Sequence, residues 1–584
     1  MPSLHWIGKE AVVNHHHAVP FHLLRDVPEL SVGEPGAGNL IVQGDNLVAL
    51  KALLPYYAGQ VKCICVDPPY NTGNEGWIYN DNANSPVIRA WLGKTVGKES
   101  EDLSRHDKWL CMMYPRLQIF KQLLSRDGLI AISIDDNEFS HLGVMMDDIF
   151  GSNNRLACAP WLAEPSGGKE KTGLRGGHEY VLIYHNGNDA NVSRESRSTG
   201  ELNLKDKWGK YRKGRELMKW GGTSLRKDRP GQWFSLKTPD GVEVWPIKND
   251  GNEGHWRWGK EQKMKEIVID SERAHWELRP FDDGVTWQGK NERYVPYEKI
   301  RDSAKSIGWS TWLDSYGFNA DATRELKNIF GTKPFDTPKP VALIKWLISL
   351  HADEDALVLD SFGGSGTTGH AVMQLNKEDG GNRRFILVEM ESNIARDITA
   401  ERVKRVAQGY TNLKGEQVEG LGGGFRFCEL GEPLFDETGK IRESVCFADL
   451  ARHVYFTETG EPLPERSAGF SPLQHSHSRK ASENSTLSTT RELKRPEGRA
   501  PKSPVLGVHN GRAVCLLYNG ILKDKSPDGG NALTQSTLAL LRAACDGQRV
   551  ERLVVYGTSQ RLSPARLKRE GVTFKQIPYS IRIT

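Results

Sequence analysis

The sequence predicts an α/β fold built on a doubly wound, largely parallel sheet. Short apolar runs alternate with amphipathic segments over residues 40–150, and the same rhythm returns over residues 341–388. This alternation is typical of parallel strands connected by helices. Two of the apolar runs end in distinctive loops, Asp67 to Tyr70 and Asp360 to Gly369. Ligands bind beyond the carboxyl ends of the strands in open sheets of this class, so both loops are candidate functional sites.

The individual elements follow from the apolar pattern and from the turn residues between them. Strands are expected at residues 40–45, 61–66, 129–134, 178–184, 356–359 and 384–388, and helices at residues 46–54, 109–124, 138–150, 341–350 and directly after Gly369. We expect no internal repeat.

Composition divides the chain into five segments. Ten of the sixteen tryptophans lie between Trp208 and Trp312, and basic residues alternate with aromatic ones in His255 to Lys260. We therefore expect a β-rich domain inserted into the sheet domain. The expected segments are 1–190 for the first half of the sheet domain, 191–330 for the insertion, 331–465 for the second half, 466–505 for a flexible linker rich in Ser, Pro, Lys and Arg, and 506–584 for a small C-terminal α/β module.

Charge and cysteine usage limit the class of protein. The net charge is +4 and the pI about 8.4, so any surface that binds nucleic acid must be a local one. The eight cysteines form no CxxC pair, which indicates reduced thiols in a cytoplasmic protein. The N-terminal residues lack the features of a signal peptide, and no apolar stretch reaches membrane-spanning length. We expect a soluble intracellular protein.

His15, His16 and His17 are the one run that suggests a metal site. Three adjacent side chains on a regular element cannot converge on one ion, so we expect no metal there.

Asp67-Pro68-Pro69-Tyr70 has the chemistry needed to hold a planar amino group. The Asp67 carboxylate and the Pro68 carbonyl can each accept one amino hydrogen, which frees the nitrogen lone pair for attack. The two prolines fix the backbone, and Tyr70 can stack on a base that has left the duplex. The alternative is an ordinary proline turn after a strand.

The glycines Gly364, Gly366 and Gly369 leave two cofactors open. Their spacing satisfies the dinucleotide fingerprint, and Glu389 lies twenty residues past the last glycine, where an acid that binds ribose is expected. A nicotinamide or S-adenosylmethionine fits this pattern equally well. A phosphate-binding loop is excluded because no lysine precedes Thr367.

Taken together and in this order, the motifs resemble those of β-class, circularly permuted DNA adenine-N6 methyltransferases, and in particular the modification subunits of type III restriction-modification systems. The resemblance covers residues 35–430. It rests on Gln43 to Asn46, Asp67 to Gly73, Ile132 to Asp136, Phe150 to Asn153, Gly177 to Tyr180, Gly254 to Lys260, Phe335 to Pro340 and Asp360 to Gly369. Ser361 departs from the family pattern, in which proline is commoner.

The resemblance implies a Rossmann-like S-adenosylmethionine-dependent methyltransferase sheet with an inserted target-recognition domain. It implies catalytic roles for Asp67, Pro68, Pro69 and Tyr70, and Asp at the first of these positions usually accompanies adenine as target. The implied cofactor-binding residues are Asp45, Lys339, Pro340, Asp360, Phe362, Gly364, Gly366, Thr367 and Glu389. Asp45 also suits a helix cap, and both roles can hold. The implied partners are double-stranded DNA, a second copy of the chain and a helicase-nuclease subunit.

Three functions are compared on this basis. The leading hypothesis is a site-specific DNA adenine-N6 methyltransferase of a restriction-modification or related phage-defence system. The second is a DNA-recognition scaffold for a helicase-nuclease partner, and N4-cytosine methylation is the alternative chemistry. A nicotinamide-dependent oxidoreductase is the third.

Overall fold

The computed structural model separates two compact units, Arg194–Trp309 and the rest of the chain. The structure describes residues 4–33, 38–72, 104–167, 170–171, 173–187, 192–198, 200–261, 274–351, 353–464, 504–518, 531–545 and 548–577. The expected linker at 466–505 therefore lies outside the described residues, apart from its last two positions.

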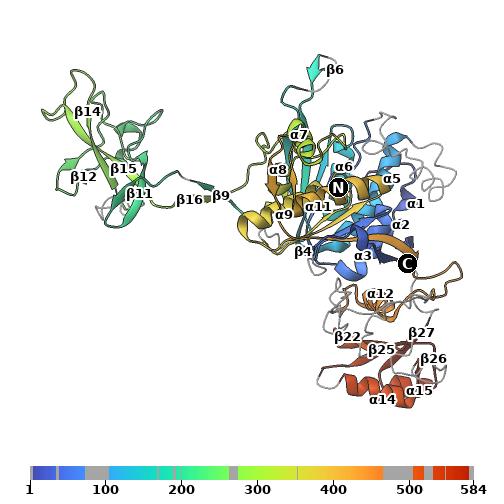
Figure 1. Cartoon of the computed structure of the whole chain (residues 1–584). Coiled ribbons are helices and arrows are strands. Elements are labelled where there is room, and N and C mark those ends of the chain that lie inside the picture. The colour runs from blue at the N-terminus through green and yellow to red at the C-terminus, as the bar shows by residue number, and fades with distance from the viewer. Residues whose placement is uncertain are drawn as a thin grey trace, which may run out of the picture. The chain divides into compact units, whose positions relative to one another are not determined.

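A nine-stranded mixed sheet forms the centre of the larger unit (Figure 1). Its strand order is β1-β21-β2-β18-β17-β3-β4-β8-β5, and the six strands from β21 to β4 are parallel. The bounds are β1 His22–Asp26, β2 Leu40–Gln43, β3 Val61–Val66, β4 Leu124–Ile134, β5 Arg155–Leu162, β8 His178–His185, β17 Leu357–Asp360, β18 Arg384–Glu389 and β21 Arg426–Pro433.

Helices cover both faces of this sheet, as a doubly wound fold requires. They are α3 Asn46–Tyr57, α5 Arg105–Leu123, α6 Phe139–Phe150, α7 Asn319–Phe330, α8 Val341–Ser349, α9 Thr367–Asp379, α11 Glu401–Gln408 and α12 Phe447–Thr459, with short turns α1 Lys9–Val12, α2 His15–Ala18 and α10 Ser392–Ile394 and a π-helical turn Ala395–Ala400. Leu40 and Ile64 pack with α3, α5 and α6 in one core cluster. On the opposite face, Cys63 contacts α8 and Leu387 lies beside Gly369 of α9.

The expected strands and helices match this structure in type and order, the sheet is largely parallel as expected, and one boundary of the insertion needs correction. The strand at His178–His185 is antiparallel to both of its neighbours, so the parallel sheet has an antiparallel edge. Residues 310–330, expected in the insertion, belong to the larger unit. The physical reason is that α7 buries Leu326 against Ile394 and Ile398, beside α11.

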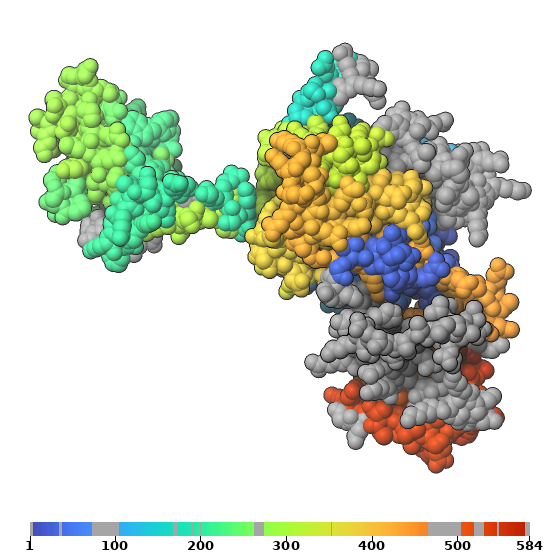
Figure 2. Space-filling view, in the orientation of Figure 1, coloured from blue at the N-terminus to red at the C-terminus, as the bar shows by residue number. Residues whose placement is uncertain are grey.

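Segments that lie far apart in the sequence meet at one edge of the sheet. Strand β1 pairs antiparallel with β21, which joins His22 to Pro433 and Asp26 to Cys428. In the space-filling view of Figure 2, dark blue N-terminal residues accordingly lie against yellow and orange residues from much later in the chain.

The smaller unit, green in Figure 1, is β-rich. Its main sheet is antiparallel, in the order β10 Leu204–Asp206, β11 Gly209–Glu216, β15 Glu292–Ile300 and β14 Ala274–Pro280. Two further two-stranded sheets are formed by β9 Glu195–Ser198 and β16 Ala304–Ile307, and by β12 Leu236–Lys237 and β13 Glu243–Val244. Trp256 is buried in its core beside Leu217 and Met218. Trp208 and Trp220 are exposed.

The C-terminal residues form a second small sheet that packs on α12. Its order is β22 Val505–His509, β23 Arg512–Leu516, β25 Arg552–Gly557 and β27 Val572–Gln576, with helices α14 Gln535–Ala544 and α15 Pro564–Arg569. Strand β22 pairs antiparallel with β23, and the other neighbours are parallel. Leu506 and Val554 belong to the same core cluster as Val454 of α12. In the part of the chain that the structure describes, no helix is long and apolar enough to cross a membrane.

Candidate active site

The Asp67 to Tyr70 loop leaves the carboxyl end of β3, where α5 holds it. The indole Nε1 of Trp109, a fully buried residue of α5, donates to the Pro69 carbonyl over 2.6 Å. The Tyr70 hydroxyl donates to Oε2 of Glu179 on β8 over 2.8 Å. Burial raises the pKa of Tyr70 well above its usual value, so this hydroxyl keeps its proton. The carbonyl of Pro69 is thus occupied and the tyrosine ring is fixed at its polar end.

Asn71 continues this loop in a left-handed conformation, with φ at 58°. Its amide donates to Glu138, whose side chain is fully buried, and to the Arg105 carbonyl over 3.2 Å. Glu138 also meets the Nδ1 atoms of His106 and His141, at 2.7 and 2.8 Å. Within the described ranges, these two histidines and Glu138 are the one group with metal-ligand spacing. Each is already engaged in a hydrogen bond inside the cluster, and together they hold Asn71. Gly73, the last residue of the motif, lies outside the described residues.

Lys339 reaches the Asp67 carboxylate. Its Nζ lies 2.8 Å from Asp67 Oδ2 and 3.6 Å from Glu179 Oε2. Burial alone would lower the pKa of this lysine, but the two carboxylates raise it above its usual value, so the ammonium stays charged. The sequence motif places Lys339 among cofactor-binding residues. The structure adds a direct partner, the catalytic candidate itself.

The glycine loop between β17 and α9 is braced from behind by two buried side chains. Gly364 and Gly366 both have positive φ, 47° and 77°, which the tight strand-to-helix turn requires. The Thr399 hydroxyl donates to the Gly364 carbonyl over 2.6 Å. The Arg402 guanidinium donates to the hydroxyl oxygens of Ser365 and Thr367 over 3.0 and 2.8 Å. Neither Thr399 nor Arg402 stands in a recognisable motif, which is why sequence reasoning missed both.

Asp360 begins this loop and is 7% exposed. It accepts hydrogen bonds from the Thr368 hydroxyl over 2.6 Å and from the Phe362 amide over 3.0 Å. Burial, together with the negative charge of Asp67, raises the pKa of Asp360 to about 7 despite these bonds. A buried acid that titrates near neutrality favours a cationic ligand, whose charge would stabilise the carboxylate.

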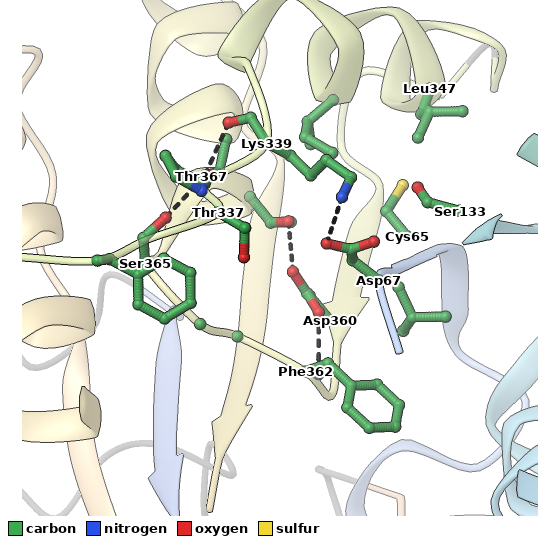
Figure 3. Close-up of a pocket in the computed structure, with 17 residues that line it drawn as sticks. Cys65, Asp67, Ser133, Thr337, Lys339, Leu347, Asp360, Phe362, Ser365 and Thr367 are labelled. Atoms are coloured by element: carbon green, nitrogen blue, oxygen red, sulfur yellow. Dashed lines mark hydrogen bonds and ion pairs between the residues drawn. The ribbon is translucent and has the colours of Figure 1, made fainter. Parts of the chain in front are cut away.

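The two loops line one pocket (Figure 3), a cavity of about 40 Å³ that opens to solvent. Its walls include Asp67, Lys339, Asp360, Phe362, Gly364 and Thr367 of the predicted site, together with Cys65, Ser133, Phe335, Thr337 and Leu347. Figure 3 shows the Lys339 side chain extending toward Asp67, with Asp360 and Phe362 below them. The sequence-distant halves of the predicted site are therefore contiguous.

Other predicted residues are not among those that line this pocket. Asp45 caps α3, because its Oδ1 accepts from the Val48 amide over 3.1 Å, which is the local role that the sequence indicated. Pro340 is buried and directly precedes α8. Glu389 accepts from the backbone amides of Gly364 and Glu391, at 2.9 and 2.8 Å.

Burial raises the pKa of Glu389 to about 8. Each carboxylate oxygen has a second lone pair. The contacts with the backbone amides therefore leave Glu389 able to accept hydrogen bonds from the ribose hydroxyls that the motif predicts. Both the ribose role of Glu389 and an adenine contact by Asp45 remain predictions.

Comparison with known proteins decides the family. A family model described as DNA methylase matches residues 61–401, which span both loops of the pocket. The chain belongs to the DNA methylase family. The modification subunit of the type III restriction-modification enzyme EcoPI, from Escherichia phage P1, is 33% identical over 429 residues, which are 67% of this chain and 64% of that protein.

Two further relatives have restriction-modification names. The type II methyltransferase M.KpnI of Klebsiella pneumoniae is 33% identical over 401 residues, 64% of this DNA methylase and 89% of that protein. The StyLTI modification subunit of Salmonella typhimurium is 32% identical over 399 residues, which are 63% of this chain and 57% of that protein. The match thus covers less than two thirds of either type III subunit. A solved structure of the cytosine-N4-specific PvuII DNA methyltransferase also matches, at 13% identity over 65% of this chain and 95% of that one, with a TM-score of only 0.29.

Proposed function

We propose that this DNA methylase is a site-specific DNA adenine-N6 methyltransferase that uses S-adenosylmethionine. The observation that carries the proposal is the single pocket formed by Asp67 of the first loop and Asp360, Phe362 and Gly364 of the second. One loop offers acceptors for an amino group and the other offers a buried acid, an aromatic ring and close backbone approach for a cationic nucleoside. A nicotinamide site would give the hydrogen-bond acceptors of the Asp67 to Tyr70 loop no amino group to bind.

When bound, S-adenosylmethionine supplies an electrophilic methyl group and accepts the electron pair of the breaking carbon–sulfur bond. The chain's own residues prepare the nucleophile. Asp67 and the Pro68 carbonyl accept the two amino hydrogens, which localises the lone pair on nitrogen. Tyr70 stacks on the flipped base. After the carbon–nitrogen bond forms, the nitrogen loses one hydrogen as a proton, which passes along the hydrogen bond to Asp67 and then to water. No covalent enzyme intermediate is needed.

Adenine is proposed as the target because the first residue of the loop is Asp67. This preference comes from the resemblance of the motif to N6-adenine enzymes, and N4-cytosine is the alternative that the same experiment tests.

The smaller unit supplies the proposed DNA-recognition surface. It contains several cations placed over tryptophan rings: Arg226 lies 4.9 Å from the Trp233 centroid, and Lys248 lies 5.5 Å from that of Trp220. Such pairs provide the charge and flat apolar surface that nucleic-acid contact uses. His255 is excluded from this surface, because it is 3% exposed and its ring nitrogens contact the carbonyls of Trp256 and Thr223.

The decisive experiment is transfer of labelled methyl from S-adenosylmethionine to double-stranded DNA, followed by nucleoside analysis. We expect N6-methyladenine in a fixed sequence context with the native chain and none with Asp67→Ala. Labelled N4-methylcytosine would overturn the assignment of the base, and equal labelling by Asp67→Ala would overturn the assignment of the loop.

We also propose association with a second copy and with a helicase-nuclease subunit. The support is that two relatives are named as subunits of restriction-modification enzymes. Light scattering of the purified chain and affinity capture from cells that express the neighbouring genes test the two proposals separately. A monomer at micromolar concentration contradicts the first, and capture of the chain alone contradicts the second.

A further inference from the structure

The two oxygens of the Asp67 carboxylate have different surroundings. Oδ2 lies 2.8 Å from the Lys339 ammonium. Oδ1 is buried, and no hydrogen-bond partner reaches it from the described residues. The Tyr70 hydroxyl donates its hydrogen to Glu179 instead. A buried acceptor without a donor costs free energy, which makes Oδ1 the natural contact for a ligand hydrogen.

Lys339 is held in place from several sides. Its side chain is 9% exposed, and its Nζ lies 4.7 Å from the centroid of the Tyr70 ring. Its own carbonyl accepts a hydrogen bond from the Thr367 hydroxyl over 3.2 Å, so the backbone from which it projects is tied to the glycine loop. An ammonium fixed in this way restricts rotation of the carboxylate that it contacts.

Glu179 links this lysine to the aromatic residue of the loop. One atom, Oε2, accepts from Tyr70 and lies 3.6 Å from Lys339. The residue comes from β8, the antiparallel strand next to β4. Its position on a buried strand of the sheet, rather than on a loop, gives the cluster a rigid support.

We propose that Lys339 and Glu179 are positioning residues for the methyl transfer: Lys339 holds Oδ2 of Asp67 so that Oδ1 faces the target amine, and Glu179 fixes both Lys339 and Tyr70. The inference rests on the proposed function. It assigns Lys339 a role at the nucleophile in place of the cofactor contact that its motif predicts. It also gives a role to Glu179, which lies in the family segment Gly177 to Tyr180 but was assigned none there.

The test separates positioning from cofactor binding. Lys339→Met keeps the length of the side chain and removes its charge. We expect its single-turnover rate at saturating S-adenosylmethionine to fall by about 100-fold, as for loss of one preorganised charged contact, while the dissociation constant for S-adenosylmethionine, measured by calorimetry, changes less than about threefold. Lys345→Met removes another lysine, which pairs with Glu378, and serves as the matched control with the native rate.

A double-mutant cycle shows whether Lys339 acts through Asp67. In an Asp67→Asn background, Lys339→Met should slow the residual reaction no further, because the carboxylate that it positions is absent. The double variant Asp67→Asn, Lys339→Met loses one negative and one positive charge from the same buried contact. Its folding is therefore expected to be closer to native than that of Lys339→Met alone, so a folding defect of the single variant does not obscure the result. Additive losses of rate, or a weaker affinity for S-adenosylmethionine with an unchanged rate at saturation, would overturn the positioning role.

Glu179→Gln completes the test. It keeps an oxygen for the Tyr70 hydroxyl and removes the negative charge beside Lys339, so we expect a loss of rate of about tenfold, smaller than for Lys339→Met. An unchanged rate contradicts the role of Glu179. If the native chain transfers no methyl group to adenine at all, the proposed function fails before any variant is compared, and that failure is thus distinguishable.

Discussion

Leu359 of β17 is in parallel register with Ile64 of β3, although residues 65–358, which include the whole smaller unit, lie between them in the sequence. Parallel strands end at the same edge of a sheet, so this pairing starts the Asp67 loop and the Asp360 loop side by side. The reversed order of the motifs therefore leaves the geometry of the pocket intact. It also brings two acids close enough for Asp67 to raise the pKa of Asp360.

The first prediction concerns the pH dependence of cofactor binding. The pKa of Asp360 is about 7, so the side chain is neutral below that pH and negative above it. A cationic ligand prefers the carboxylate, so affinity for S-adenosylmethionine should rise with pH by up to about tenfold per unit below pH ~7 and then level off. Calorimetry at several pH values measures this. Asp360→Asn should lack the rise, and because both proteins bind the same ligand, titration of the ligand itself cancels in the comparison.

The same shift predicts the stability of the free protein. The folded-state pKa of Asp360 lies above that of the unfolded chain, so its contribution to stability is fully present below the unfolded value and is lost as pH rises through about 7. The melting temperature of Asp360→Asn relative to that of the native chain should therefore rise between pH 5 and pH 8. A constant difference between the two would contradict the raised pKa.

The sheet and its two loops were predictable because strong local signals define them. The run from Val61 to Val66 is apolar and ends in paired prolines, and the glycine spacing after Asp360 permits few alternatives. The antiparallel direction of β8 was not predictable, since an apolar run carries no mark of direction. Arg402 and Glu179 were also missed as parts of the site, because their roles arise from tertiary contacts between distant elements rather than from spacing along the chain.

A second prediction tests the brace behind the glycine loop. Thr399→Val is nearly isosteric and removes the hydroxyl that donates to Gly364. Loss of this bond should cost about 1 kcal/mol and raise the dissociation constant for S-adenosylmethionine about fivefold. Thr457→Val is the matched control, because Thr457 makes the same kind of bond to the His453 carbonyl within α12. Equal effects of both substitutions on cofactor affinity would show that only global stability is involved.

A third prediction concerns Asn71, whose φ of 58° is unfavourable for residues other than glycine, asparagine and aspartate. Asn71→Ala should lose about 1 to 3 kcal/mol of stability from backbone strain and from the hydrogen bond to buried Glu138, and methyl transfer should slow because the loop after Tyr70 is loosened. Thermal unfolding and single-turnover kinetics measure the two effects.

Asn510→Ala is the control for Asn71→Ala, since Asn510 has a φ of 49° in an exposed turn of the C-terminal module. It should lose stability through the backbone and an exposed contact with His509, and keep the native rate of transfer. Asn71→Asp should be worse than Asn71→Ala, because it places a second negative charge against Glu138. If Asn71→Asp is as stable as the native chain, the contact with Glu138 does not contribute to the stability of the fold.

The last prediction concerns the C-terminal module, which one carboxylate of α12 contacts at two strands. Glu458 accepts from the Tyr556 hydroxyl over 2.5 Å and pairs with Lys575, so it ties two strands of the module, β25 and β27, to the helix. Glu458→Ala leaves both groups at a partly buried contact without their acceptor, at a cost of about 1 to 3 kcal/mol. Amides of β25 should then exchange with solvent faster, while those of β3 in the central sheet should not. Glu570→Ala, on the module itself but away from α12, should leave both strands unchanged; uniform acceleration in β3 and β25 would mean that the module and the sheet unfold together.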